Sequence, residues 1–170
     1  MRSFFSVHVV SLILLAFGFC GPAMSQETTG WQFDSLSAQQ STEKSETQAI
    51  YEVLLRMLDR WNAHDLEGHL DVYWRSPELL VIVDSEQVNG WQQLHDCYAN
   101  GYPDPSAMGF ITPTRIQVKK LTADIALALT WWSVKFPNSK HTVVGNTTMN
   151  LRKFGDSWKI VCAHTSTAEM

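Results

Sequence analysis

The sequence has little positive charge. Its 13 lysines and arginines stand against 17 aspartates and glutamates, which gives a formal net charge of −4 at pH 7. A protein whose main partner is nucleic acid normally presents a basic stripe to the phosphate backbone. The composition therefore argues against nucleic acid as a partner.

Motifs of well-known chemistry are also missing. The sequence contains no GxSxG, no glycine-rich phosphate loop and no CxxC. Its histidines are dispersed and show neither HxH nor HExxH spacing, which zinc sites commonly use. We therefore expect no metal and no other cofactor.

Cysteine is scarce, with three residues in the chain. Cys20 falls in the leader described below, which leaves Cys97 and Cys162 in the mature protein. Two cysteines cannot form the disulfide framework of a small secreted scaffold. They could pair with each other, but we favour two buried thiols that pack as small apolar side chains.

Residues 1–25 have the layout of a secretory signal peptide. Arg2 precedes an apolar run over residues 7–19, and the small residues Ala23 and Ser25 stand at the −3 and −1 positions of a cleavage site. The apolar run is short for a membrane span, although an uncleaved anchor is the alternative. We predict cleavage after Ser25, a periplasmic or secreted protein, and no membrane association afterwards.

The rest of the chain divides into an arm and one domain. Residues 26–45 are polar and lack any sustained period, so we expect a flexible arm. Residues 46–168 show helical and then strand periodicity and form the predicted domain. We expect helices over 46–64, after Asp65 and over 91–102, and strands over 79–84, around 116–118, and over 124–136, 142–154 and 158–167.

This order of elements predicts an α+β fold in which the three N-terminal helices cover one face of a curved antiparallel sheet. Turn signals at Asn138-Ser139 and Gly155-Asp156 set the register of the last three strands. One face of the sheet should then carry Ala126, Ala128, Thr130, Trp132, Val134, Thr147, Met149, Leu151, Ile160, Cys162 and His164. A slip of one residue would turn these side chains to the other face.

That face should line a pocket for a small, largely apolar molecule. Small side chains leave room there, and threonines with a histidine form a polar group among apolar neighbours, as in many ligand pockets. We predict a pocket lined by Thr130, Trp132, Thr147, Met149, Cys162, His164, Trp91 and Tyr98.

His164 is the candidate for chemistry, because an ordinary histidine titrates near neutral pH and can act as an acid or a base. Tyr98 or Asp84 could assist it. The alternatives are that His164 is a neutral core histidine and that Asp84 serves a turn.

The opposite face of the sheet carries an apolar patch of Leu127, Leu129, Trp131 and Val161. Exposed patches of this kind usually mark protein interfaces. We predict a homodimer through this face; the alternative is that the N-terminal arm covers it.

Three stretches suggest a family: RWNAHDLEGHLDVYW (60–74), VNGWQQLHDCYANGY (88–102) and GNTTMNLRKFGDSWKIVCAHTS (145–166). Together with the order of elements, they resemble the nuclear transport factor 2-like superfamily. More narrowly, they resemble its SnoaL-like and calcium-calmodulin-dependent kinase II association-domain-like branch. The resemblance implies a cone-shaped sheet around a pocket and a dimer.

The resemblance leaves three functions open, because this fold carries many activities. The first is an exported domain that binds a small apolar ligand. The second is a lyase, cyclase or isomerase that uses His164, although no Asp or Glu falls on the predicted inner face. The third is a dimeric assembly module.

Overall fold

The structure is a computed structural model that describes residues 31–137 and 139–169. The predicted signal peptide, 1–25, lies outside the described residues. The elements are α1 (Trp31–Asn62), α2 (Leu66–Leu70), β1 (Leu80–Val83), β2 (Glu86–Asn89), α3 (Trp91–Gly101), the 3-10 helix η1 (Pro105–Ala107), β3 (Phe110–Lys120), β4 (Ile125–Lys135), β5 (Thr142–Phe154) and β6 (Ser157–Glu169).

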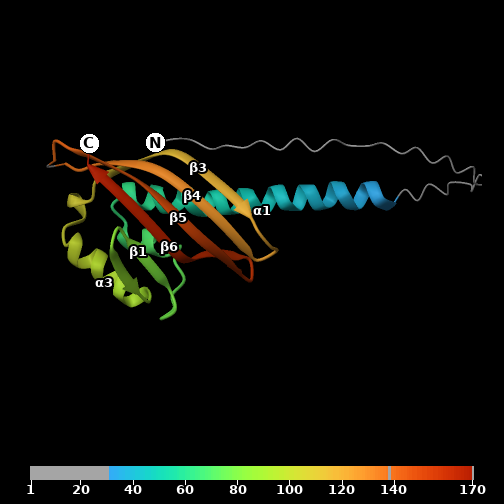
Figure 1. Ribbon diagram of the computed structural model, residues 1–170, viewed down its shortest axis with the longest axis horizontal. Coiled ribbons are helices and arrows are strands. Elements are labelled where there is room, and N and C mark those ends of the chain that lie inside the picture. Colours follow the sequence, from blue (N-terminus) through green and yellow to red (C-terminus); the bar gives the residue numbers. More distant parts are fainter. Residues whose placement is uncertain (1–30, 138, 170) are drawn as a thin grey trace, which may run out of the picture.

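The strands form one curved six-stranded sheet in the order β2-β1-β6-β5-β4-β3, and α1 runs along one of its faces (Figure 1). The predicted α+β class, with three helices against a curved sheet, is confirmed. One pairing differs from the expected antiparallel arrangement: β1 lies parallel to β6, so the sheet is mixed. The partner of β1 is some 80 residues further along the chain, and no turn signal indicates its direction.

The first helix begins at Trp31, which corrects the predicted start of the helix at residue 46. No glycine or proline occurs between Trp31 and Asn62, so nothing in the backbone interrupts the helix. Its N-terminal part projects past the end of the sheet (Figure 1). None of the helices in the described part of the chain combines the length and the apolar run that crossing a bilayer requires.

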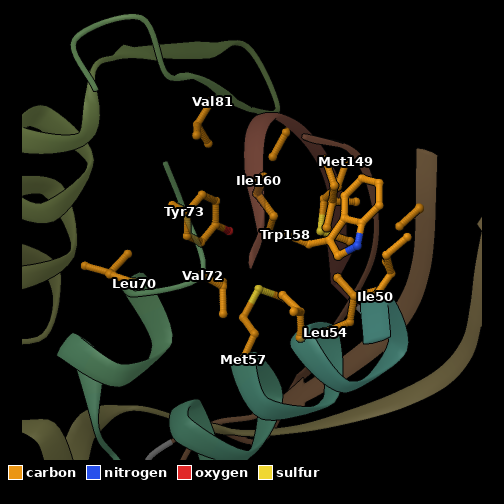
Figure 2. Close-up of a cluster of buried hydrophobic side chains, with 14 of the residues drawn as sticks. Ile50, Leu54, Met57, Leu70, Val72, Tyr73, Val81, Met149, Trp158 and Ile160 are labelled. Atoms are coloured by element: carbon orange, nitrogen blue, oxygen red, sulfur yellow. The ribbon is translucent and has the colours of Figure 1, made fainter. Parts of the chain in front are cut away.

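The core fills one end of the space between α1 and the sheet. Ile50, Leu54 and Met57, spaced by about one helical turn, point from α1 toward β5 and β6 (Figure 2). Opposite them, the small Ala126 and Ala128 of β4 are fully buried. We call this the closed end of the sheet.

The register between β4 and β5 is the predicted one, with Thr130 opposite Thr147. The register between β5 and β6 shifts by one residue, because Leu151 pairs with Ile160 whereas Asn150 pairs with Cys162. Val161 is the extra residue of a β-bulge, and a bulge breaks the alternation of side chains along its strand.

After the bulge, the side chains of β6 point to the opposite face of the sheet from the one predicted. Trp158 and Ile160 are buried on the inner face, but the next buried side chain is Ala163 rather than Cys162. The prediction that Cys162 and His164 point inward is therefore wrong. Their place on the inner face is taken by Ala163 and by Thr165, which pairs with Thr147.

Candidate functional site

Beyond the closed end, the helices and the inner face of the sheet line a cavity of about 400 Å³ that is open to solvent on one side. Met57, Leu58 and Trp61 of α1 form one wall. The other lining residues come from α2, α3 and the sheet, and include His69, Tyr98, Tyr102, Ile111, Thr130, Trp132, Val134, Val143, Thr147 and Thr165. The inner residues of β4 thus pass from buried alanines at the closed end to the walls of the cavity.

Two residues at the end of α1 fix the helix against β3. The Nε1–H of Trp61 donates to the carbonyl oxygen of Gly109 at 2.6 Å. The amide of Asn62 bonds to Ile111 in both directions, donating from Nδ2 to its carbonyl oxygen at 2.9 Å and accepting its N–H at Oδ1 at 2.8 Å. These bonds hold the Trp61 ring at the cavity wall.

A chain of hydrogen bonds orders the sheet side of the cavity. The Nε1–H of Trp132 donates to Oγ1 of Thr147 at 3.0 Å, and this oxygen lies 3.0 Å from Oγ1 of Thr165. Gly145 permits this arrangement, because a Cβ there would lie 2.6 Å from the Trp132 ring. The polar group predicted as Thr130, Thr147 and His164 is therefore Thr130, Thr147 and Thr165.

His69 is the buried imidazole of the cavity. Its side chain is 5% exposed, and its Nδ1 lies 2.9 Å from the carbonyl oxygen of Met57. A carbonyl oxygen can only accept, so Nδ1 carries a proton. Burial lowers the pKa of His69 to about 4, against the smaller opposing effect of the Met57 bond. The ring is therefore neutral at pH 7, with an unprotonated Nε2.

Aromatic rings surround His69. The ring centroid of Trp61 lies 5.2 Å away in an edge-to-face arrangement, and those of Tyr98 and Tyr73 lie 5.7 and 6.2 Å away. Burial raises the pKa of Tyr73 to about 12. It also raises the pKa of Tyr98 well above its ordinary range, with a further contribution from the nearby Tyr73. Both phenols are protonated and able to donate hydrogen bonds.

The described part of the cavity wall is uncharged. None of the described residues that line it is Asp, Glu, Lys or Arg. An ion that entered would lose its hydration and find no opposite charge to replace it. The site is suited to a neutral molecule.

Four of the eight predicted pocket residues line the cavity: Tyr98, Thr130, Trp132 and Thr147. The other four lie elsewhere. Met149 is fully buried in the core, and Trp91 packs beneath the guanidinium of Arg75 at 4.6 Å. Cys162 and His164 occupy the outer face, where His164 is exposed opposite Ile82. These four assignments to the pocket are wrong, the last two because of the bulge.

Asp84 is the turn residue of the β1–β2 hairpin, with φ of +52°, and it does not line the cavity. Its carboxylate accepts hydrogen bonds from the N–H and the hydroxyl of Thr167, both at 2.8 Å, and these bonds lower the pKa of Asp84. Thr167 itself lines the cavity, so Asp84 positions a wall residue.

Neither cysteine pairs, and both remain free thiols. Cys97 is exposed and lines the cavity, whereas we expected it to be buried; Cys162 is half-buried. Within the described residues, no three His, Cys, Asp or Glu side chains come together in a way that could hold a metal ion.

Sequence reasoning missed His69 and Thr165. A signal for His69 was present, because it follows Leu66 by three residues and precedes Tyr73 by four, which places it on the apolar side of the helix that starts after Asp65. Thr165 carries no such signal, since it enters the cavity only through the bulge.

Comparison with solved structures identifies the fold. An NTF-2-like protein of unknown function from Shewanella oneidensis MR-1 matches with a TM-score of 0.67 and 29% identity, over 71% of this chain and 98% of that one. An NTF2-like protein of unknown function from Pseudomonas putida KT2440 matches with a TM-score of 0.64 and 14% identity, over 72% of this chain and 87% of that one. A cystatin-like fold protein from Burkholderia xenovorans LB400 matches with a TM-score of 0.58 and 19% identity, over 73% of this chain and 92% of that one.

No protein-family model and no curated protein matches the sequence. The structural matches cover nearly the whole of the Shewanella protein and most of the described part of this chain. The narrower resemblance to the SnoaL-like branch stays a prediction. The chain has the fold of nuclear transport factor 2-like proteins.

Proposed function

We propose that the protein binds a small, neutral, largely apolar molecule in the cavity between α1 and the sheet. One observation carries the proposal: a volume of about 400 Å³ has walls of aromatic and aliphatic side chains, a few uncharged polar groups, and no charged residue among those described. Ligand pockets combine these features, with apolar walls for affinity and a few polar groups for orientation.

The enzyme alternative has less support. It relied on His164 with Asp84 or Tyr98, and of these three only Tyr98 lines the cavity. A general base must lie within hydrogen-bond reach of its substrate, so an exposed histidine on the outer face cannot serve a ligand in the cavity. Among the described lining residues there is also no carboxylate, which isomerase chemistry would need.

We also propose that the protein acts outside the cytoplasm, after removal of residues 1–25. The charged start, the apolar run and the small residues before Gln26 support this proposal. Mass spectrometry of protein recovered from the periplasm or the medium should give a chain that begins at Gln26. Recovery of the intact chain from the cytoplasm would contradict it.

Binding can be tested with three probes of one shape: naphthalene, 2-methoxynaphthalene and the anion 2-naphthoate. An NMR titration should follow the indole N–H of Trp132, which lies on the cavity wall. We expect both neutral probes to shift this signal and the anion to leave it unchanged at the same concentration. Binding of 2-naphthoate as tight as that of naphthalene would contradict the proposal.

Adjacent valines on β5 provide a matched pair of variants. Val143 lines the cavity, whereas its neighbour Val144 belongs to the opposite face, and both are half-buried. Val143→Trp should fill the cavity and abolish binding of the neutral probes. Val144→Trp should bind them as the wild type does. Equal binding by both variants would place the probes outside the cavity.

A further inference from the structure

The imidazole of His69 presents an unused hydrogen-bond acceptor. Its Nδ1–H is committed to the carbonyl oxygen of Met57, and its Nε2 makes no hydrogen bond to any described residue. Every described side-chain nitrogen or oxygen that is cut off from solvent has a partner. Because Nε2 has none, it is accessible, and the cavity that His69 lines gives that access.

An acceptor in such a place requires a donor from the ligand. The side chain is 5% exposed, so Nε2 has little access to bulk water. A buried acceptor left without a partner loses its hydration without compensation, and a ligand without a donor would impose this cost on binding. The donor must be an O–H or N–H group at the inner end of the molecule.

The neighbouring phenols restrict the chemistry of that group. The hydroxyls of Tyr73 and Tyr98 form no hydrogen bond with a described residue, and both side chains line the same cavity. They are protonated and can donate to a ligand oxygen. A hydroxyl group can both donate to Nε2 and accept from a phenol, whereas a carbonyl can only accept.

The charge of the donor group distinguishes an amine from an alcohol or a phenol. An aliphatic amine would be protonated at neutral pH, and the described cavity walls offer no carboxylate to pair with it. An alcohol or a phenol stays neutral. The aromatic rings of Trp61, Tyr98 and Trp132 in the same walls favour a flat apolar body behind the hydroxyl.

We infer that the natural ligand is a neutral alcohol or phenol with an apolar ring body, whose hydroxyl donates a hydrogen bond to Nε2 of His69. The inference rests on the proposed function, since it names the class of molecule that the same cavity takes. It assigns to His69 a role in ligand selection, alongside its bond to Met57.

The test compares 2-naphthol with 2-methoxynaphthalene, which keeps the oxygen but lacks the donor. Wild-type protein should bind 2-naphthol about tenfold more tightly, the value of one hydrogen bond. His69→Asn keeps a donor for the Met57 carbonyl and removes Nε2, so its affinities for the two probes should agree within about twofold. His164→Asn, the same change at an exposed histidine, should keep the tenfold preference.

The ¹⁵N resonances of the wild-type protein give a second readout that does not depend on the variant's folding. The Nε2 signal of His69 should move upfield on addition of 2-naphthol and stay in place with 2-methoxynaphthalene. Equal affinities in the wild type, a preference that survives in His69→Asn, or an unmoved Nε2 signal would overturn the inference alone. Failure of naphthalene, 2-methoxynaphthalene and 2-naphthol to bind would overturn the proposed function as well.

Discussion

Glu46 of α1 and Lys153 of β5 form an ion pair across the closed end of the sheet, with Oε1 2.7 Å from Nζ. The second carboxylate oxygen of Glu46 accepts the indole N–H of Trp158 at 3.0 Å. Both bonds lower the pKa of Glu46, because both favour its charged form. One carboxylate thus ties the helix to two strands, and it does so beside the core rather than beside the cavity.

Removal of this carboxylate should loosen α1 from the sheet. We expect Glu46→Ala to lower the free energy of unfolding by about 1–3 kcal/mol, since it leaves Lys153 and the indole of Trp158 without their acceptor. Glu52→Ala, an exposed position on the same helix, should change it by less than about 0.5 kcal/mol. Urea unfolding followed by circular dichroism measures both. Similar losses in the two variants would show that the ion pair does not stabilise the fold.

The parts of the fold that the sequence predicts are those that depend on local signals. Hairpin turns join β4 to β5 and β5 to β6, so turn residues fix the pairing of Phe154 with Ser157 and of Thr130 with Thr147. The partner of β1 depends on a contact far along the chain, and no local residue indicates that β1 runs parallel to β6. That pairing therefore needed the structure.

The prediction of the candidate site assumed that side chains alternate regularly along each strand. This assumption holds for β4 and fails for β6. Thr130 and Trp132 follow the alternation of a regular strand, so their direction could be deduced. No glycine or proline near Val161 indicates the bulge in the sequence. The bulge turns the side chains that follow it to the other face of the sheet. A single histidine, His164, therefore moved from the predicted site to the opposite face.

Two adjacent residues test the direction of β6 after the bulge. Ala163 is buried against the core and His164 is exposed. Ala163→Leu should overfill the core and lower the free energy of unfolding by about 1–3 kcal/mol, whereas His164→Leu should change it by less than about 0.5 kcal/mol. Chemical denaturation of both variants gives the comparison. The reverse order would mean that β6 keeps regular alternation.

The buried His69 should make the protein less stable in mild acid. Its pKa is about 4 in the folded protein and about 6.5 in the unfolded chain, so between these values the unfolded state binds the proton first. Protonation of His69 therefore does not reduce the free energy of unfolding above pH 6.5. It lowers this free energy as the pH falls from 6.5 to 4, by about 3 kcal/mol at most. Unfolding curves across this range should show the decline in the wild type and in His164→Asn. An equally steep decline in His69→Asn would assign it to other groups.

The half-buried His95 should act in the opposite direction. Its Nε2 lies 2.7 Å from Oε1 of Glu67, which raises the pKa of His95, with a smaller contribution from Asp96. Because the pKa is raised on folding, His95 makes its full contribution to the free energy of unfolding below pH 6.5. This contribution is lost as the pH rises through the pKa of His95 in the folded protein. His95→Gln should therefore be less stable than the wild type by about 0.5 kcal/mol near pH 5.5, with the difference vanishing in alkali. A difference that grows with pH would have the wrong sign.

The outer face of the sheet should join two copies of the chain. Leu127, Leu129, Trp131 and Val161 are half-buried there, and the guanidinium of Arg115 lies 4.9 Å over the ring of Trp131. In a dimer these side chains would be covered by the same patch of the other copy, and burial of their apolar surface would contribute to the free energy of association. The proposed cavity lies on the opposite face, so association leaves it open.

A charge in the centre of the patch separates this interface from the cavity. Leu129→Asp should convert the dimer into a folded monomer in sedimentation velocity, because two carboxylates would face a dry contact. Asn100→Asp adds the same charge at an exposed position on α3 and should leave the dimer intact. Since Leu129 points away from the cavity, its variant should bind naphthalene as the wild type does. A wild-type protein that sediments as a monomer would refute the dimer, and a dimeric Leu129→Asp would place the interface elsewhere.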